Sequence, residues 1–235
     1  MSAFHLFKLS LLLSLLPNSI IPNSQKSTGL FPPTCSRIEC PTYDLIQAGN
    51  GYEIRRYNST VWISTSPIQD ISLVDATRDS FLQVYYYYLK NAIDYIQGKN
   101  EYQEHIEMTA PVITQVSPSD GPFCESSFVV SFYVPKKNQA NPPPAKGLHV
   151  QKWGPAYAAV RQFSGFVSDS EVGEEAAALE ASLAGSIWSA AIEKSRPDDP
   201  TSTYTVAQYN SPFEYEERVN EIWMMFDMED EVGAL

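Results

Sequence analysis

Histidine is the side chain most often used for proton transfer and metal binding near neutral pH, and the chain has three of them. His105 lies on the polar side of a predicted strand, and His149 opens another strand. Each is a candidate metal ligand, although an isolated histidine is more often a surface residue. No Ser/His/Asp set, metal-spaced cluster or phosphate-binding glycine loop accompanies them in the sequence. The residues assemble no catalytic site, so they favour a binding protein over an enzyme.

An arginine within an apolar helical stripe is a second candidate for chemistry. The apolar periodicity predicts a long helix over residues 73–97. Steps of three and four residues place Arg78 on one face with apolar and aromatic residues, among them Val74, Phe81 and Tyr85. A guanidinium keeps its charge, so an inward-facing Arg78 needs an anion, either a buried carboxylate such as Glu53 or Glu221 or a ligand carboxylate. Otherwise the side chain reaches out to solvent.

The helix is expected to end where a sheet begins. Gly98 can adopt the left-handed conformation that stops a helix, and Asn100 is a second candidate for that position. The alternation of Ile106, Met108 and Ala110 with polar residues predicts a strand with these three residues buried. Pro111 cannot donate a ladder hydrogen bond, so it marks an edge or a bulge.

The cysteines and one sequon suit an oxidising compartment. Cys35, Cys40 and Cys124 are an odd number, so at most one bridge forms within the chain. Either Cys35 pairs with Cys40, or one of them pairs with Cys124. Asn58 opens an Asn-Ser-Thr sequon in a predicted turn, which makes it a candidate glycosylation site.

The two ends of the chain differ from its middle. Lys8 precedes a short apolar run, so residues 1–24 are predicted to be a secretory signal peptide, with an amphipathic surface helix or a plastid transit peptide as the alternatives. This places the protein in the secretory pathway, outside the cell or in a vacuole. Residues 25–42 are expected to form an extended arm, and residues 229–235 an acidic, solvated tail.

The charge and hydropathy exclude several partners. The net charge of −12 repels phosphate backbones and anionic lipids, so we expect neither nucleic-acid binding nor stable membrane insertion. A protein partner is not indicated by any motif.

The order of predicted elements repeats. A strand, a helix and two strands occur twice, with the second long helix at residues 171–194. Residues 52–57 and 157–163 are faint echoes of each other. These patterns predict an α+β fold in which duplicated strand-helix-strand-strand units form a curled, distorted antiparallel β-barrel flanked by two long helices. Residues 52–66 form either a hairpin or one bent strand.

Four sequence blocks in order carry a family resemblance. They are Tyr-Glu-Ile-Arg-Arg-Tyr (52–57), Tyr-Ile-Gln-Gly-Lys-Asn with Ile-Glu-Met-Thr-Ala-Pro-Val (95–112), Val-Arg-Gln-Phe-Ser-Gly-Phe (160–166), and Tyr-Asn-Ser-Pro with Asn-Glu-Ile-Trp (209–223). Together they resemble the SOUL haem-binding protein family, and the resemblance assigns residues 43–228 to its domain. In the blocks themselves, Trp223 is expected to be core material, and Glu221 to satisfy a buried arginine or backbone donors.

The resemblance implies non-covalent binding of haem or another porphyrin in an apolar depression beside the first long helix. Arg78 matches a family arginine that would meet a propionate. Two further basic positions of the family fall near Asp94 and Glu214 here, and Arg56 stands where some members have an axial histidine. The implied function is therefore a tetrapyrrole carrier or buffer. The alternatives are an enzyme acting on a small apolar metabolite in the same pocket, and a protein-interaction module.

Overall fold

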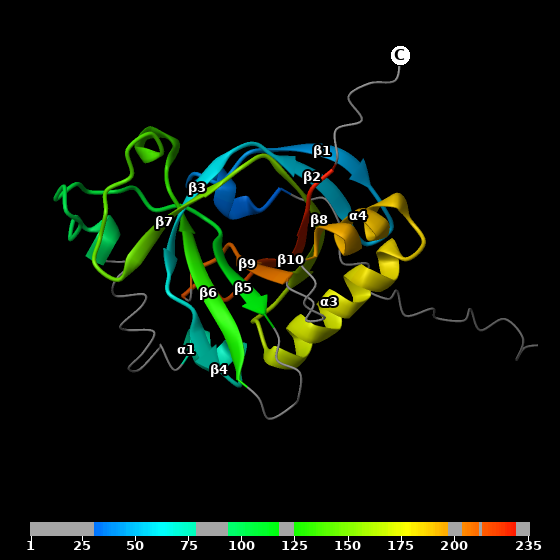
Figure 1. Ribbon diagram of the computed structural model, residues 1–235. Helices are drawn as coiled ribbons and strands as arrows, with labels where there is room; N and C mark the ends of the chain where they lie inside the picture. Colours follow the sequence, from blue (N-terminus) through cyan, green and yellow to red (C-terminus); the bar gives the residue numbers. More distant parts are fainter. Residues whose placement is uncertain (1–30, 79–93, 118–124, 197–203, 212, 229–235) are drawn as a thin grey trace, which may run out of the picture.

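The computed structural model describes residues 31–78, 94–117, 125–196, 204–211 and 213–228. In these ranges ten strands form one curled sheet, and helices pack against it (Figure 1). The predicted α+β fold class, a curled antiparallel sheet with flanking helices, is confirmed. The predicted signal segment and acidic tail lie outside the described residues.

The elements follow the alternation of apolar and polar residues along the chain. The strands are β1 (Tyr43–Ala48), β2 (Glu53–Tyr57), β3 (Thr60–Thr65), β4 (Ile68–Asp70), β5 (Val112–Ser117), β6 (Ser126–Tyr133), β7 (Leu148–Trp153), β8 (Ala156–Ser164), β9 (Tyr204–Gln208) and β10 (Val219–Phe226). The helices are α1 (Leu73–Arg78), α3 (Asp169–Leu183) and α4 (Ile187–Ser195), with the short 3₁₀ helices η1 (Pro33–Ser36) and η3 (Lys136–Asn138).

A long, bent two-stranded ribbon runs through the sheet. β2 continues into β3, and β7 continues into β8, through a short bend in each case. β2 pairs with β8 and β3 with β7 in one unbroken antiparallel register, from Glu53↔Val160 at one end to Thr65↔Leu148 at the other. Of the two alternatives for residues 52–66, the structure therefore has the bent strand.

The two halves of the chain repeat the same pairing scheme. In the first half β6 pairs with β3 and with β5. In the second half β10 pairs with β8 and with β9 in the same way. The two halves meet where β5 pairs with β9. The predicted duplication is present, with β7 as the equivalent of β2. The proposed echo between residues 52–57 and 157–163 is wrong, because it matches β2 to β8, its partner in the ribbon. β1 pairs with β2, whereas in the described residues β7 ends the sheet with β3 as its one strand neighbour.

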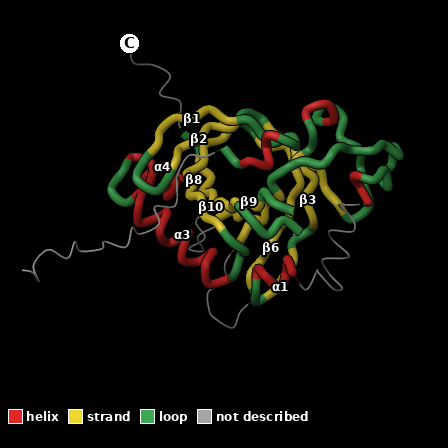
Figure 2. Tube along the Cα trace, turned by 180° about the vertical axis from the view of Figure 1, so that it is seen from behind, coloured by secondary structure: helices red, strands yellow, loops and turns green. Residues whose placement is uncertain are grey.

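One face of the sheet is covered by the helices. Ile54 and Ile222 on the strands pack in one core with Leu73 of α1, Leu179 of α3 and Ile192 of α4. Figures 1 and 2 show α3 and α4 against the β8–β10 side and α1 at the end near β4 and β6. Among the described helices, none is both long enough and apolar enough to cross a bilayer.

The opposite face is aromatic and is closed by the N-terminal arm. Tyr57, Trp62 and Trp223 form its centre, and Ile38 and Cys40 pack against them. The prediction of an extended arm is wrong for its second half. The chain turns through η1, and a disulfide joins Cys35 to Cys40. A backbone hydrogen bond also joins the arm to the segment before β5, because the Ala110 amide donates to the Glu39 carbonyl at 3.0 Å.

The second long helix is broken into two. Gly185 has a φ of +73°, a left-handed conformation that ends the helical path after α3. Ser186 then begins α4, because its hydroxyl accepts a hydrogen bond from the Ser189 amide at 3.2 Å. The prediction of one helix over residues 171–194 is therefore corrected at these two residues.

The helix stop is confirmed, but the strand predicted after it is not. Gly98 has a φ of +92°, and residues 94–96 are helical, while the middle of the predicted helix lies outside the described residues. Asn100 instead turns the chain, since its amide group donates to the Tyr95 carbonyl at 2.9 Å. Ile106 is buried, but Met108 is 60% exposed, because this stretch is a loop and β5 begins only after the cis Ala110–Pro111 bond.

Candidate functional site

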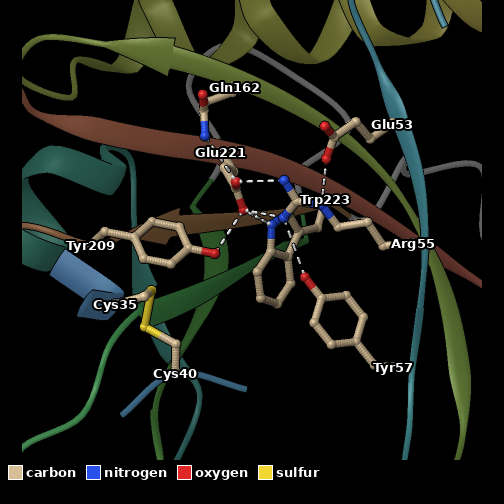
Figure 3. Close-up of polar contacts among 9 residues, drawn as sticks. All are labelled: Cys35, Cys40, Glu53, Arg55, Tyr57, Gln162, Tyr209, Glu221 and Trp223. Carbon is tan, nitrogen blue, oxygen red and sulfur yellow. Dashed lines mark hydrogen bonds and ion pairs between the residues drawn. A yellow bond between two sulfur atoms is a disulfide. The ribbon is translucent and has the colours of Figure 1, made fainter. Parts of the chain in front are cut away.

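Arg55 and Glu221 form a buried ion pair on the aromatic face of the sheet (Figure 3). Arg55 Nη2 donates to Glu221 Oε1 at 2.9 Å, and Nη1 donates to Oε2 at 3.0 Å. Arg55 Nε donates to Glu53 Oε2 at 2.8 Å, and the guanidinium carbon lies 4.2 Å from the centroid of the Tyr43 ring. Arg55 is 1% and Glu221 0% exposed, so the pair is shielded from solvent.

Three neutral side chains complete the shell of Glu221. The Tyr209 hydroxyl donates to Oε2 at 2.8 Å, and Trp223 Nε1 donates to the same oxygen at 2.7 Å. Gln162 Nε2 donates to Oε1 at 3.3 Å. The expectation that Glu221 satisfies a buried arginine and that Trp223 is core material is confirmed. With both oxygens occupied, Glu221 has little capacity left for a ligand.

The strand geometry explains how these residues meet. Glu53, Arg55 and Tyr57 alternate along β2, so they share one face of the sheet. Arg55 pairs in register with Ala158 of β8, and Glu221 of β10 pairs with Gln162 of β8, so the guanidinium reaches diagonally across β8 to Glu221. The ion pair therefore joins β2 to β10 across the strand between them.

The electrostatics of the cluster keep the arginine charged and the tyrosines neutral. Burial disfavours the charged guanidinium, but the attraction of Glu221 outweighs it, and the pKa of Arg55 is raised above its ordinary value. Burial, with the nearby Glu221 carboxylate, raises the pKa of Tyr57 and of Tyr209 well above the ordinary tyrosine value. The cluster is thus a fixed, fully bonded charge arrangement that links β2 to β10.

The sequence did not identify Arg55 as a buried residue. In β2 only Arg56 is exposed, and the charged residues Glu53 and Arg55 are buried beside Ile54 and Tyr57. A signal was nevertheless present, because Glu53, Arg55 and Tyr57 recur at every second position beside apolar residues. Glu53 and Glu221, suggested as partners of Arg78, are both bound to Arg55.

The proposed ligand residues lie on or after α1. Leu73 and Ala76 face the helical core, while Val74 is half-buried. Arg78 is the last residue of described α1, and its side chain, with Phe81 and Tyr85, lies outside the described part. Ile71, just before the helix, is 66% exposed. Apolar surface is therefore open where α1 begins.

The described histidines lie apart from any metal-binding group. His105 is exposed in the loop before β5, and His149 is exposed on β7, with its Nε2 3.1 Å from the Ser66 hydroxyl. Within the described ranges no three His, Cys, Asp or Glu side chains gather to hold a metal ion.

Asp94, Glu214 and Arg56 form surface ion pairs. The family resemblance expects basic residues near the first two and an axial histidine at the third. Asp94 accepts from Lys99 at 2.7 Å, and Glu214 accepts from Arg37 at 2.7 Å. Arg56 donates to Asp44 at 2.8 Å on the exposed side of β2. These residues form three separate surface ion pairs, with Lys99, Arg37 and Asp44.

Two cavities in the described residues have charged walls. One, of about 420 Å³, lies between the arm and the β9–β10 loop and is lined by Arg37, Glu214, Glu216 and Glu217. The other, of about 230 Å³, lies between α3 and α4 and includes Glu180, Glu193 and Arg196. Sites for apolar ligands are lined mainly by hydrophobic and aromatic side chains, so neither cavity suits an apolar ring system that carries carboxylates.

The candidate modification residues also have defined places. Cys35 and Cys40 form the disulfide of the arm, and Cys124 lies outside the described residues. Asn58 is exposed in the bend between β2 and β3. Its side chain is therefore accessible for modification.

A family model and two related proteins point to one family. A family model described as SOUL heme-binding protein matches residues 38–225. Heme-binding protein 2 of Homo sapiens is 36% identical over 176 residues, covering 74% of this chain and 77% of that protein. Heme-binding protein 2 of Mus musculus is 32% identical over 194 residues, covering 80% and 86%. The solved EcmrR C-terminal domain aligns with a TM-score of 0.49 at 10% identity, over 79% of this chain and 98% of that one. The matched range contains the whole Arg55–Glu221 cluster.

Proposed function

Because the chain belongs to the SOUL heme-binding protein family, we propose that it binds haem or a related tetrapyrrole non-covalently, as a carrier or buffer. The observation that carries the proposal is the family match over residues 38–225, joined by two relatives that are named heme-binding proteins. The described cavities have acidic walls that would repel propionates, so the ligand is assigned to another surface.

The proposed site is the outer face of the first helix. Exposed Ile71 and half-buried Val74 supply apolar surface where α1 begins, and Arg78 follows one turn later. The residue spacing adds Phe81 and Tyr85 to the same face. These residue types fit a tetrapyrrole, because apolar side chains contact the ring and a guanidinium pairs with a propionate carboxylate. When bound, haem would supply its own iron chemistry, and this chain would hold and orient the ring.

Binding is proposed to need no axial histidine. His105 and His149 are exposed on different segments, and Arg56 occupies the place of an axial histidine in some relatives. Apolar contact and the Arg78 charge would then carry the affinity, and metal-free protoporphyrin should bind about as well as hemin.

The test is a spectroscopic titration of the chain without residues 1–24. Arg78→Ala is expected to weaken the binding of hemin and of protoporphyrin by roughly tenfold to a hundredfold, the value of a hydrogen bond to a charged group. His105→Ala and His149→Ala should leave both affinities unchanged. Arg56→Ala, which removes an exposed arginine on β2, is the matched control. Binding of both porphyrins no stronger than to an unrelated acidic protein would refute the proposal.

A second candidate function is catalysis on a small apolar metabolite in the same pocket. It is favoured by Asp94 and Glu214, which place carboxylates where the family resemblance expects basic partners for propionates. Turnover of such a metabolite that is insensitive to added porphyrin would support it. A role as a protein-interaction module predicts neither turnover nor porphyrin binding.

We further propose that the protein enters the secretory pathway and is glycosylated at Asn58, with an extracellular or vacuolar destination. The signal-like residues 1–24, the exposed sequon and the Cys35–Cys40 disulfide support this. Expressed with its N-terminus in a secretory host, the protein should lose one glycan-sized mass on glycosidase treatment, and Asn58→Gln should abolish that change. Import into isolated plastids without glycosylation would instead favour the transit-peptide alternative.

A further inference from the structure

The edge of β7 is where the internal repeat is incomplete. β2 and β7 are equivalent strands of the ribbon, and β2 has β1 paired along its outer edge. At the matching edge of β7 the described residues place no strand, and the sheet ends there. An open sheet edge presents backbone donors and acceptors to which another extended chain can pair.

The chemistry of this edge differs from the rest of the molecule. The chain has a net charge of −12, yet residues 126–168 contain no aspartate or glutamate. Lys146, just before β7, and His149 and Lys152 on it are all exposed. Val150, between the last two, is 39% exposed and adds an apolar contact surface. The edge therefore presents cationic side chains around an apolar residue.

The pairing of β1 shows which residue type suits this edge. Arg56 is the penultimate residue of β2, and its register partner on β1 is Asp44, with which it forms an ion pair at 2.8 Å. Lys152 is the penultimate residue of β7 and is exposed in the same way. A strand added to β7 as β1 is added to β2 would place one side chain opposite Lys152. A carboxylate there would reproduce the Asp44–Arg56 pair.

We propose that β7 binds an extended acidic segment of another protein as an added antiparallel strand, with a carboxylate opposite Lys152. Main-chain hydrogen bonds would supply affinity, and Lys152 with Val150 would select the side chains. Nucleic acids and anionic membranes fit less well, because the net charge of the whole chain repels them. Pairing of two copies through β7 would bring like charges of Lys146 and Lys152 together, which disfavours it.

The test uses the chain without residues 1–24 and a synthetic peptide with the β1 sequence Tyr-Asp-Leu-Ile-Gln-Ala, blocked at both ends. We expect the peptide to slow amide hydrogen exchange in residues 148–153. The Lys152→Glu variant should bind at least roughly fivefold more weakly, since an exposed attraction becomes a repulsion. Lys194→Glu on α4 makes the same charge change elsewhere, and it should bind as the parent does. Replacing the peptide aspartate with asparagine should also weaken binding, but by less than Lys152→Glu, because it removes the attraction without adding a repulsion.

Several outcomes would overturn the proposal. The first is that amide hydrogen exchange in residues 148–153 is unchanged at saturating peptide. The second is that Lys152→Glu binds the peptide as tightly as the parent does while its unfolding midpoint is unchanged. The third is that heparin or phosphatidylserine vesicles slow exchange in these residues more than the peptide does. Porphyrin binding is measured at a different surface, so its presence or absence leaves these outcomes unaffected.

Discussion

Replacing Arg55 with alanine is expected to lower the free energy of unfolding by about 3–5 kcal/mol, the range found when one partner of a buried ion pair is removed. The variant leaves Glu221 and Glu53 in a region where Arg55 is 1% and Glu221 0% exposed. Their charge is then uncompensated, although Tyr209 and Trp223 still donate to Glu221. Urea denaturation followed by tryptophan fluorescence measures the loss, since Trp223 lies in the cluster.

The neighbouring residue provides the control. Arg56 also pairs with an aspartate at 2.8 Å, but that pair is about half exposed on both sides, and Arg56→Ala should cost at most about 1 kcal/mol. Glu221→Gln keeps the shape of the side chain and removes its charge, so it tests the same pair if Arg55→Ala does not fold. Equal losses for Arg55→Ala and Arg56→Ala would contradict the view that the buried cluster holds β2 to β10.

Much of the fold was readable from the sequence because it rests on local signals. The repeated order of predicted strands and helices indicated the α+β fold, and Gly98 marked the end of a helix. The errors arose where one residue decides between two structures. Gly185 splits a helix whose apolar stripe continues on both sides. The loop at Met108 keeps the alternation of a strand, but in the described residues it pairs only through an isolated bridge between Thr109 and Glu39.

The buried cluster was harder to predict, because its partners are far apart in the chain. Arg55 and Glu221 are 166 residues apart and meet only because β8 lies between β2 and β10. Single-sequence patterns report which residues share a strand face, and they do not report which strands become neighbours. The open edge of β7 is likewise a property of strand order, visible only after the repeat is laid out in space.

Raising the pH above about 10 is expected to destabilise the fold steeply, through Tyr57 and Tyr209. The pKa of each is raised in the folded protein, mainly by burial, above the ordinary value of 10.0. Below pH 10 both states keep the tyrosine protons, so the full stability is present. Above it the unfolded chain loses protons that the folded chain retains, and stability falls until the folded pKa is reached. Between the unfolded and the folded pKa, each tyrosine lowers the free energy of unfolding by up to about 1.4 kcal/mol per pH unit.

The Tyr57→Phe variant isolates one of these contributions. Its hydroxyl contacts Arg55 Nη1 only at 3.4 Å, so the substitution should change the unfolding free energy little at pH 8. Between pH 10 and 11 the variant should lose about 1 kcal/mol less than the parent protein, because the unfolded tyrosine goes from half to almost fully ionised; urea denaturation at each pH measures this. Tyr209→Phe should likewise reduce the fall in unfolding free energy between pH 10 and 11. It also removes the 2.8 Å hydrogen bond to Glu221, so this variant should be less stable than the parent already at pH 8. If the unfolding free energies of the parent and of Tyr57→Phe fell equally with pH, the Tyr57 hydroxyl would ionise as readily in the folded as in the unfolded chain. That result would contradict the raised pKa that burial gives this residue.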